Sequence, residues 1–332
     1  MLTVNDFFCG CGGMGLGFQE AGFTIKGAWD FDKYAVESYR ANVGDHVLQA
    51  DITTMSQEDV PIADVWTFGF PCQDLSLAGR KAGLFEGKRS GLFFEVMRLL
   101  DDTPAENLPK IIMAENVKGL KPYLGVLAEE YEQRGYKMQY KIYNSKYWGV
   151  PQNRERYFVV GTREGVDFVF PEEQHEFVPK LSSILEKNVD EKYYLKEEQG
   201  AKIVEKANLQ LADVQIEDQL EPQIEVLGML DIKAHDHSRR VHNPKGLSPT
   251  VTAVCGGTHH IKILEELQSP VRYRVRKLTP TEYGRLQGFP MDTWEHVVSN
   301  TQAYKQFGNA VTVKVAKAVA TAIKNSIEGM GK

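Results

Sequence analysis

The segment from residue 2 to residue 15 reads LTVNDFFCGCGGMG, an apolar run that leads directly into a glycine-rich loop. Residues 2–8 have the composition of a buried strand, and a helix pattern follows the loop. Gly10, Gly12 and Gly15 match G-x-G-x-x-G between these two elements, where a ligand can approach the backbone and the free N–H groups of the helix. A close-packed turn without a ligand would show the same pattern, so the loop alone does not identify a binding site.

Strand and helix patterns alternate through the first half of the chain. We expect strands at 2–8, 23–29, 63–68, 110–114 and 157–161 and helices at 13–21, 33–42, 91–100 and 124–134. Such alternation predicts a doubly wound, mostly parallel α/β sheet. Beyond about residue 171 the rhythm breaks into short polar stretches, and it resumes near 276 before a final helix over 310–323. That helix carries one apolar stripe.

The length of 332 residues exceeds what one hydrophobic core usually covers, so we predict two domains. The catalytic α/β domain comprises residues 1–170 and 300–332. A smaller domain is inserted at 171–272, and residues 273–299 form a connecting segment.

Composition places the chain among soluble globular proteins, with 42% hydrophobic and 25% charged residues. No signal-peptide pattern and no membrane-length apolar run is found, so we expect a cytoplasmic protein without a membrane partner. The four cysteines are too few and too scattered for a disulfide framework. Cys9 and Cys11 lack further ligands at metal-site spacing, and we therefore predict no metal.

Charge is distributed unevenly, although the net charge is only −6. Residues 233–277 contain nine Lys or Arg and three acids, whereas residues 172–231 contain six Lys and fifteen acids. A basic patch of this kind is a possible footprint for a polyanion, and a solvated charged face is the alternative.

Three short segments next to the expected strands carry reactive groups. Cys72 follows strand 63–68 within Gly-Phe-Pro-Cys-Gln, Glu115 and Asn116 follow strand 110–114, and two arginines precede strand 157–161. A nucleophile, an acid and guanidinium groups at strand ends suit attack on an electron-poor ring. A buried structural cysteine, a helix cap and surface ion pairs are the corresponding structural alternatives.

A second set of strand-end residues points to adenosine. Asp30 lies about twenty residues beyond the glycine loop, the spacing at which an acid can accept hydrogen bonds from ribose hydroxyls. Phe31 can cover one face of an adenine, and Asp51 can accept its amino group. Each could instead be a cap or turn residue, but together they favour an adenosine ligand.

The chain resembles the cytosine-5 DNA methyltransferases of bacteria and phages from near residue 2 to near residue 327. Six ordered blocks carry the resemblance: the glycine loop at 8–13, Gly-Phe-Pro-Cys-Gln at 69–73, Glu-Asn-Val at 115–117, Gln-x-Arg-x-Arg at 152–156, Arg-Lys-Leu-Thr-Pro through Gln-Gly-Phe-Pro at 276–290, and Tyr-Lys-Gln-Phe-Gly-Asn-Ala-Val at 304–311. The resemblance implies a Rossmann-like methyltransferase domain that uses S-adenosylmethionine, with a target-recognition domain in the insert.

The resemblance also implies the chemistry. Cys72 would add to C6 of a cytosine flipped out of duplex DNA, which makes C5 nucleophilic enough to take the methyl group. Protonated Glu115 would bind N3 and the exocyclic amine, and Arg156 would stabilise charge at O2. Arg154 and Asn116 would hold this geometry.

The remaining site residues follow from the same matching. The donor pocket would be formed by Phe8, Gly10, Cys11, Gly13, Asp30, Phe31, Asp51, Ile52, Gly69, Pro71, Leu92, Asn309 and Val311. DNA would be contacted by Arg80, Lys81, Lys88 and Arg89 of a lid over 74–90, and by Arg239, Arg240, Thr250, Gly256 and Gly257 of the insert, with His259 and His260 as further candidates. Cys9, Cys11 and Asp30 depart from the residues common in the family.

The function predicted from these features is a sequence-specific DNA (cytosine-5)-methyltransferase, a monomer acting on double-stranded DNA, with a cognate restriction endonuclease as a possible partner. A tRNA-modifying enzyme of the same family is an alternative, and the insert of about one hundred residues favours DNA because duplex readout needs a dedicated module. A dinucleotide-dependent oxidoreductase is a remote alternative, supported only by the glycine loop and Asp30.

Overall fold

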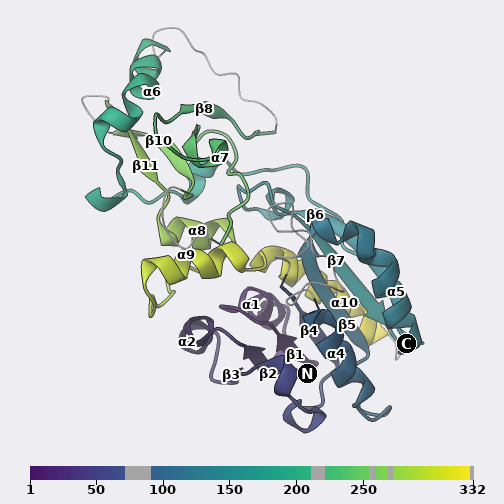
Figure 1. Cartoon of the computed structure of the whole chain (residues 1–332). Helices are drawn as coiled ribbons and strands as arrows, with labels where there is room; N and C mark the ends of the chain where they lie inside the picture. The colour runs from purple at the N-terminus through teal and green to yellow at the C-terminus, as the bar shows by residue number, and fades with distance from the viewer. Residues whose placement is uncertain (72–90, 211–220, 254–258, 268–271, 330–332) are drawn as a thin grey trace.

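The computed structural model describes residues 1–71, 91–210, 221–253, 259–267 and 272–329. Two sheets lie at opposite ends of the molecule, with helices α8 (Pro280–Leu286) and α9 (Asn300–Asn309) between them (Figure 1). In the part of the chain that is described, no helix is both long enough and apolar enough to cross a membrane.

The large sheet has seven strands in the order β3-β2-β1-β4-β5-β7-β6. Their bounds are β1 Thr3–Phe7, β2 Thr24–Asp30, β3 Val47–Gln49, β4 Val65–Phe68, β5 Ile111–Val117, β6 Lys137–Asn144 and β7 Glu155–Thr162. All neighbours pair in parallel except β7, which is antiparallel to both β5 and β6. The prediction of a mostly parallel α/β sheet is confirmed. The sequence patterns missed β6, and β3 was implied only by the strand end expected before Asp51.

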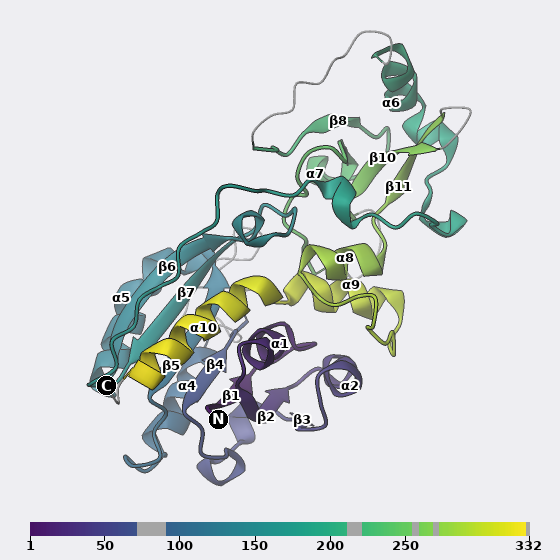
Figure 2. The same ribbon diagram turned by 180° about the vertical axis from the view of Figure 1, so that it is seen from behind.

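Among the described residues, five helices cover the two faces of this sheet. They are α1 Gly13–Glu20, α2 Lys33–Asn42, α4 Leu92–Asp101, α5 Leu124–Gln133 and α10 Val313–Gly329. Helices α4 and α5 lie on the face turned toward the viewer in Figure 1, and α1 and α10 lie on the face seen in Figure 2. Side chains of the strands alternate between the two layers: Ile112 packs with α4 and α5, whereas Ile111 and Met113 pack with α1 and α10.

The carboxyl-terminal helix α10 packs against α1 and the large sheet. Val315, Val319 and Ile323 are buried against the sheet, and a Cβ at Gly17 of α1 would lie 2.5 Å from the Ala316 Cβ. The predicted bounds 310–323 were wrong at both ends. Val311, which lies inside the predicted range, precedes the helix, which begins at Val313 and ends at Gly329.

The insert forms a small sheet in the order β11-β10-β9-β8. Its strands are β8 Val226–Met229, β9 Arg240–His242, β10 Lys262–Leu267 and β11 Arg272–Lys277, accompanied by helices α6 Glu197–Gln210 and α7 Asp236–Arg239. β11 pairs with β10 along its whole length. Most of β11 therefore belongs to the small sheet although it lies in the stretch 273–299 that we predicted as a connecting segment. The domain bounds stay a prediction.

Helix α8 is tied to the small sheet by a buried ion pair. Arg276 of β11 donates to both carboxylate oxygens of Glu282, at 2.8 Å each, and neither side chain is exposed. Glu282 also closes a capping box with Thr279, and Pro280 occupies the first turn of the helix. The start of α8 is therefore fixed relative to β11.

Candidate active site

The topology of the large sheet determines where a ligand can bind. The chain first runs outward from β1 to β2 and β3, and then returns to place β4 on the other side of β1. Loops that follow β1 and β4 consequently diverge at the carboxyl edge, which is where open α/β sheets bind ligands. The glycine loop follows β1, and Gly69 to Pro71 follow β4.

The glycine loop has the geometry of a cradle. Gly10 has a φ of +57° and a Cβ there would have nothing within 4 Å, so the loop leaves open space at this position. Its N–H donates to Asp30 Oδ2 at 2.8 Å, and the Asp32 N–H donates to Oδ1 at 2.8 Å. Burial raises the pKa of Asp30, while these N–H groups oppose the rise. Among the described residues, Phe8 alone has a positive φ without being a glycine, at 56°.

The other residues predicted to bind the methyl donor differ in how exposed they are. Phe31, which directly follows β2, is 71% exposed, so its ring is available to a ligand. Asp51 is exposed, but its Oδ1 accepts hydrogen bonds from Thr53, which makes it the cap of a short 3₁₀ helix. Ile52 and Cys11 are buried, Leu92 begins α4, and Asn309 is exposed at the end of α9.

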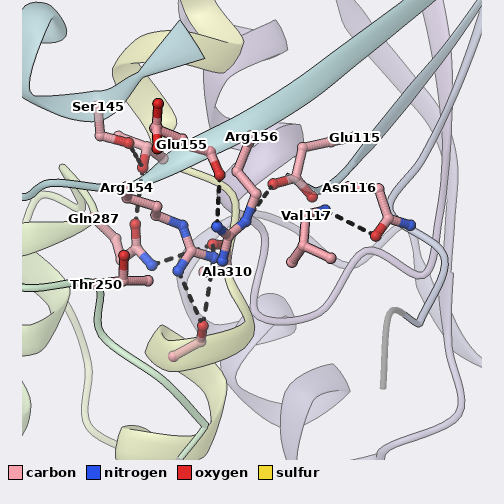
Figure 3. A network of polar contacts seen from close by, with 12 residues as sticks. Glu115, Asn116, Val117, Ser145, Arg154, Glu155, Arg156, Thr250, Gln287 and Ala310 are labelled. Atoms are coloured by element: carbon pink, nitrogen blue, oxygen red, sulfur yellow. Dashed lines mark hydrogen bonds and ion pairs between the residues drawn. The ribbon is translucent and has the colours of Figure 1, made fainter. Parts of the chain in front are cut away.

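Glu115 and Arg156 face each other across the β5–β7 pair. The Arg156 Nε lies 3.3 Å from Glu115 Oε1, and the two side chains are 16% and 10% exposed (Figure 3). Burial raises the pKa of Glu115, and the charges of Arg156 and Arg154 offset part of that rise. The raised pKa means that Glu115 takes up a proton more readily than an ordinary glutamate does. Both Glu115 and Asn116 lie inside β5, not after it as predicted.

Asn116 links this strand to the loop that leads to the cysteine. Its Nδ2 donates to the Phe70 carbonyl at 3.1 Å, and its Oδ1 accepts from the Val117 N–H at 2.8 Å. Asn116 is buried, so these bonds are not exchanged with solvent. Cys72 itself lies outside the described residues, as do Arg80, Lys81, Lys88 and Arg89 of the predicted lid.

Arg154 lies beside Arg156 but contacts different groups. It is 2% exposed and donates to the carbonyls of Val251 at 3.0 Å and Ala310 at 2.8 Å. Figure 3 shows one guanidinium directed to Ala310 and the other to Glu115. Arg154 thus joins three separate segments of the chain.

The described DNA candidates of the insert differ in accessibility. Arg240 and His259 are exposed, whereas Arg239 donates to the Leu230 carbonyl at 2.9 Å. The Thr250 hydroxyl donates to the Asn153 carbonyl at 2.6 Å. His260 is buried, with its ring 4.2 Å from that of Tyr304, and so is not placed to reach DNA. Gly256 and Gly257 lie outside the described residues.

Part of the expected basic patch is used inside the protein. Arg276 and Lys262 are buried, and Arg274 pairs with Glu191. The charge count along the sequence therefore overstates the cationic surface of the insert, because it cannot distinguish buried from exposed cations.

Sequence reasoning missed the buried polar residues behind the two arginines. Gln287 accepts hydrogen bonds from Gln152 and Thr312 and donates one to the Ala310 carbonyl. Both glutamines stand in the sequence blocks noted above, Gln-x-Arg-x-Arg and Gln-Gly-Phe-Pro, so the signal was present but carried no assignment.

Known proteins similar to this chain are methyltransferases. The family model for C-5 cytosine-specific DNA methylase matches residues 2–325. The chain is 33% identical over 341 residues to Type II methyltransferase M.NlaX of Neisseria lactamica, covering 99% of this chain and 98% of that protein.

Two solved structures share the fold. The S. pombe Dnmt2 methyltransferase superposes with a TM-score of 0.71 at 20% identity, covering 98% of this chain and 99% of its own. A putative DNA modification methyltransferase from an E. coli prophage gives a TM-score of 0.68 at 20% identity, covering 99% and 100%. The family model spans nearly the whole chain and excludes the dinucleotide-dependent oxidoreductase alternative. The chain belongs to the C-5 cytosine-specific DNA methylase family.

Proposed function

We propose that the chain is a sequence-specific DNA (cytosine-5)-methyltransferase that takes its methyl group from S-adenosylmethionine. The observation that carries the proposal is the buried pair of Glu115 and Arg156, at the sheet edge next to the loop that leads to Cys72. A type II methyltransferase as relative supports DNA as the substrate.

The residues at the glycine loop fit the donor. Open space at Gly10, an acid at Asp30 and an exposed ring at Phe31 suit the methionine, ribose and adenine portions of the molecule. When bound, S-adenosylmethionine supplies an electrophilic methyl group. Val311 lies against Gly13 of the loop and would close the pocket from the carboxyl-terminal side.

The protein side chains activate the cytosine. The Cys72 thiolate adds to C6, and the electron pair displaced from the C5–C6 bond makes C5 the nucleophile. Glu115 donates a proton toward N3, and Arg156 stabilises the negative charge at O2. Methyl transfer to C5 would leave S-adenosylhomocysteine as the second product. A base then removes the C5 proton, and the electron pair of that bond expels the Cys72 thiolate from C6, which restores the C5–C6 double bond. A duplex cytosine must leave the stack before any of this, at a cost of a few kcal/mol.

The proposal is tested by expressing the chain in a host without cytosine methylation and sequencing the bisulfite-treated DNA. Methylated cytosines in one sequence context are expected, and the Cys72→Ser variant should give none. Purified protein should form a denaturant-resistant adduct with duplexes that carry 5-fluorocytosine at the target, because fluorine cannot leave as a proton does. Methyl transfer to tRNA but not to duplex DNA would favour the tRNA alternative.

Glu115→Gln tests the acid. We expect turnover to fall by about 10²–10⁴ with donor binding nearly unchanged, since the amide cannot donate a carboxyl proton. Glu155→Gln is the matched control, because this nearby carboxylate is 40% exposed and pairs with the exposed Lys118. Equal turnover of the two variants would contradict the role of Glu115.

A further inference from the structure

Two fully buried glutamines lie where two segments meet. We call residues 249–253 the recognition segment and residues 308–312 the closing segment. Gln152 Oε1 accepts from the Val251 N–H of the recognition segment at 2.9 Å, and its Nε2 donates to the Leu286 carbonyl at 2.8 Å. One side chain therefore holds the recognition segment to the end of α8.

Gln287 holds the closing segment to the end of α8 in the same way. Its Nε2 donates to the carbonyls of Phe307 at 2.8 Å and Ala310 at 3.2 Å, and its Oε1 accepts from the Thr312 hydroxyl at 2.9 Å. Gln152 Nε2 lies 3.3 Å from that same Oε1. The two amides thus form one continuous bridge between the segments.

Arg154 and Gly308 make the contact between the segments tighter still. Arg154 donates to Val251 in one segment and to Ala310 in the other. A Cβ at Gly308 would lie 2.3 Å from the carbonyl carbon and oxygen of Thr252, so the two backbones touch without room for a side chain. Neither segment can slide past the other without breaking buried hydrogen bonds.

The closing segment also touches the glycine loop. A Cβ at Gly13 would lie 2.4 Å from the Val311 carbonyl oxygen. A ligand at the glycine loop that displaces the closing segment would therefore also displace the recognition segment. The buried hydrogen bonds between the two segments transmit the movement, because no water can replace their partners.

We propose that Gln152 and Gln287 are positioning residues that couple occupancy of the donor site to the placement of the recognition segment. The inference rests on the proposed function, because it takes the glycine loop as the donor site and the insert as the DNA-reading part. Both glutamines are fully buried, and their hydrogen bonds within the described residues go to backbone groups, to Thr312 and to each other. Their role is to make donor and duplex bind cooperatively.

The test measures a coupling factor. The Kd of the target duplex is determined with and without saturating S-adenosylhomocysteine, and the Kd of S-adenosylhomocysteine is determined with and without duplex. We expect each ligand to tighten the other by at least about fivefold in the unaltered protein, and the two factors to agree. In Gln287→Met, which keeps the bulk but loses the amide, the factor should fall to near one, while each Kd measured alone changes by less than about threefold.

Gln139→Met is the matched control. Gln139 in β6 also donates to a backbone carbonyl, that of Phe168 at 3.2 Å, but lies away from the junction, and its coupling factor should equal that of the unaltered protein. If Gln287→Met fails to fold by circular dichroism, Gln152→Met removes the other half of the bridge and gives the same test. A folded variant that retains full coupling, or an unaltered protein that binds both ligands independently, would overturn the inference. Failure of the unaltered protein to bind either ligand would instead refute the proposed function.

Discussion

Asp6 is a buried carboxyl whose ionisation should make the stability of the protein depend on pH. It lies in β1 directly below the glycine loop and is 1% exposed, and its Oδ1 accepts from the Thr67 hydroxyl at 2.9 Å. Burial raises its pKa from 3.8 to about 7, with the Thr67 hydrogen bond opposing the rise and the negative charge of Asp30 adding to it. The charged form is thus disfavoured in the folded state.

The sign and size of the effect follow from the two pKa values. Below the unfolded value of 3.8 the carboxyl is protonated in both states and folding carries no penalty. As pH rises toward the folded value of about 7 the unfolded chain ionises first, and stability is lost. At 1.36 kcal/mol per unit, the full loss is about 4 kcal/mol, of which about 2–3 kcal/mol falls between pH 5 and pH 8.

The Asp6→Asn variant removes the ionisation while retaining an acceptor for Thr67. Urea unfolding of both proteins at constant ionic strength, followed by tryptophan fluorescence and circular dichroism, should show the stability difference moving in favour of Asn by about 2–3 kcal/mol from pH 5 to pH 8. Asp64→Asn is the control. Bonds to Lys110 and Thr3 lower the pKa of Asp64, so both of its pKa values lie below pH 5 and its difference should stay constant over that range. A constant difference for Asp6→Asn as well would refute the reasoning.

Two further predictions concern packing around the site. Glu282→Gln should destabilise the protein by about 1.5–3 kcal/mol, because the fully buried Arg276 loses its charged bidentate partner but keeps Glu265 at 2.8 Å, and urea unfolding measures the loss. Gly13→Ala should cost about 1–3 kcal/mol and weaken donor binding measured by calorimetry, since the new Cβ would lie 2.4 Å from the Val311 carbonyl oxygen; unchanged stability and unchanged affinity would show that this contact relaxes freely.

Much of the large domain could be predicted because its signals are local. The apolar run before the glycine loop and the periodic helix at Lys33–Asn42 each specify their own element, and α2 was predicted to the residue. Element ends were less reliable. The polar residues Glu115 and Asn116 interrupt the apolar pattern of the strand, which led us to end it at residue 114. Residues 115–117 nevertheless continue β5, because β7 supplies pairing partners for all three.

The insert was harder to predict because long-range pairing specifies it. Its strands are short, and Arg240–His242 and Lys262–Leu267 carry charged residues that resemble a loop. Burial of Arg276 and Lys262 depends on partners elsewhere in the fold, such as Glu282 and the carbonyls of Ser238 and His260. No local pattern distinguishes those cations from ones that face solvent, and the basic patch was overestimated for that reason.

The reversal of β7 explains how the arginines reach the site at all. In an all-parallel sheet the residues just before a strand lie at its amino-terminal edge, opposite to the edge where the glycine loop and Glu115 are found. Arg156 stands near the start of β7, so a parallel β7 would have placed it at the wrong edge. The hairpin made by β6 turns the chain round, and Arg156 then pairs in register with Val117, two residues beyond Glu115 on β5. The strand that the sequence patterns missed is therefore the one that brings the guanidinium within 3.3 Å of the carboxylate.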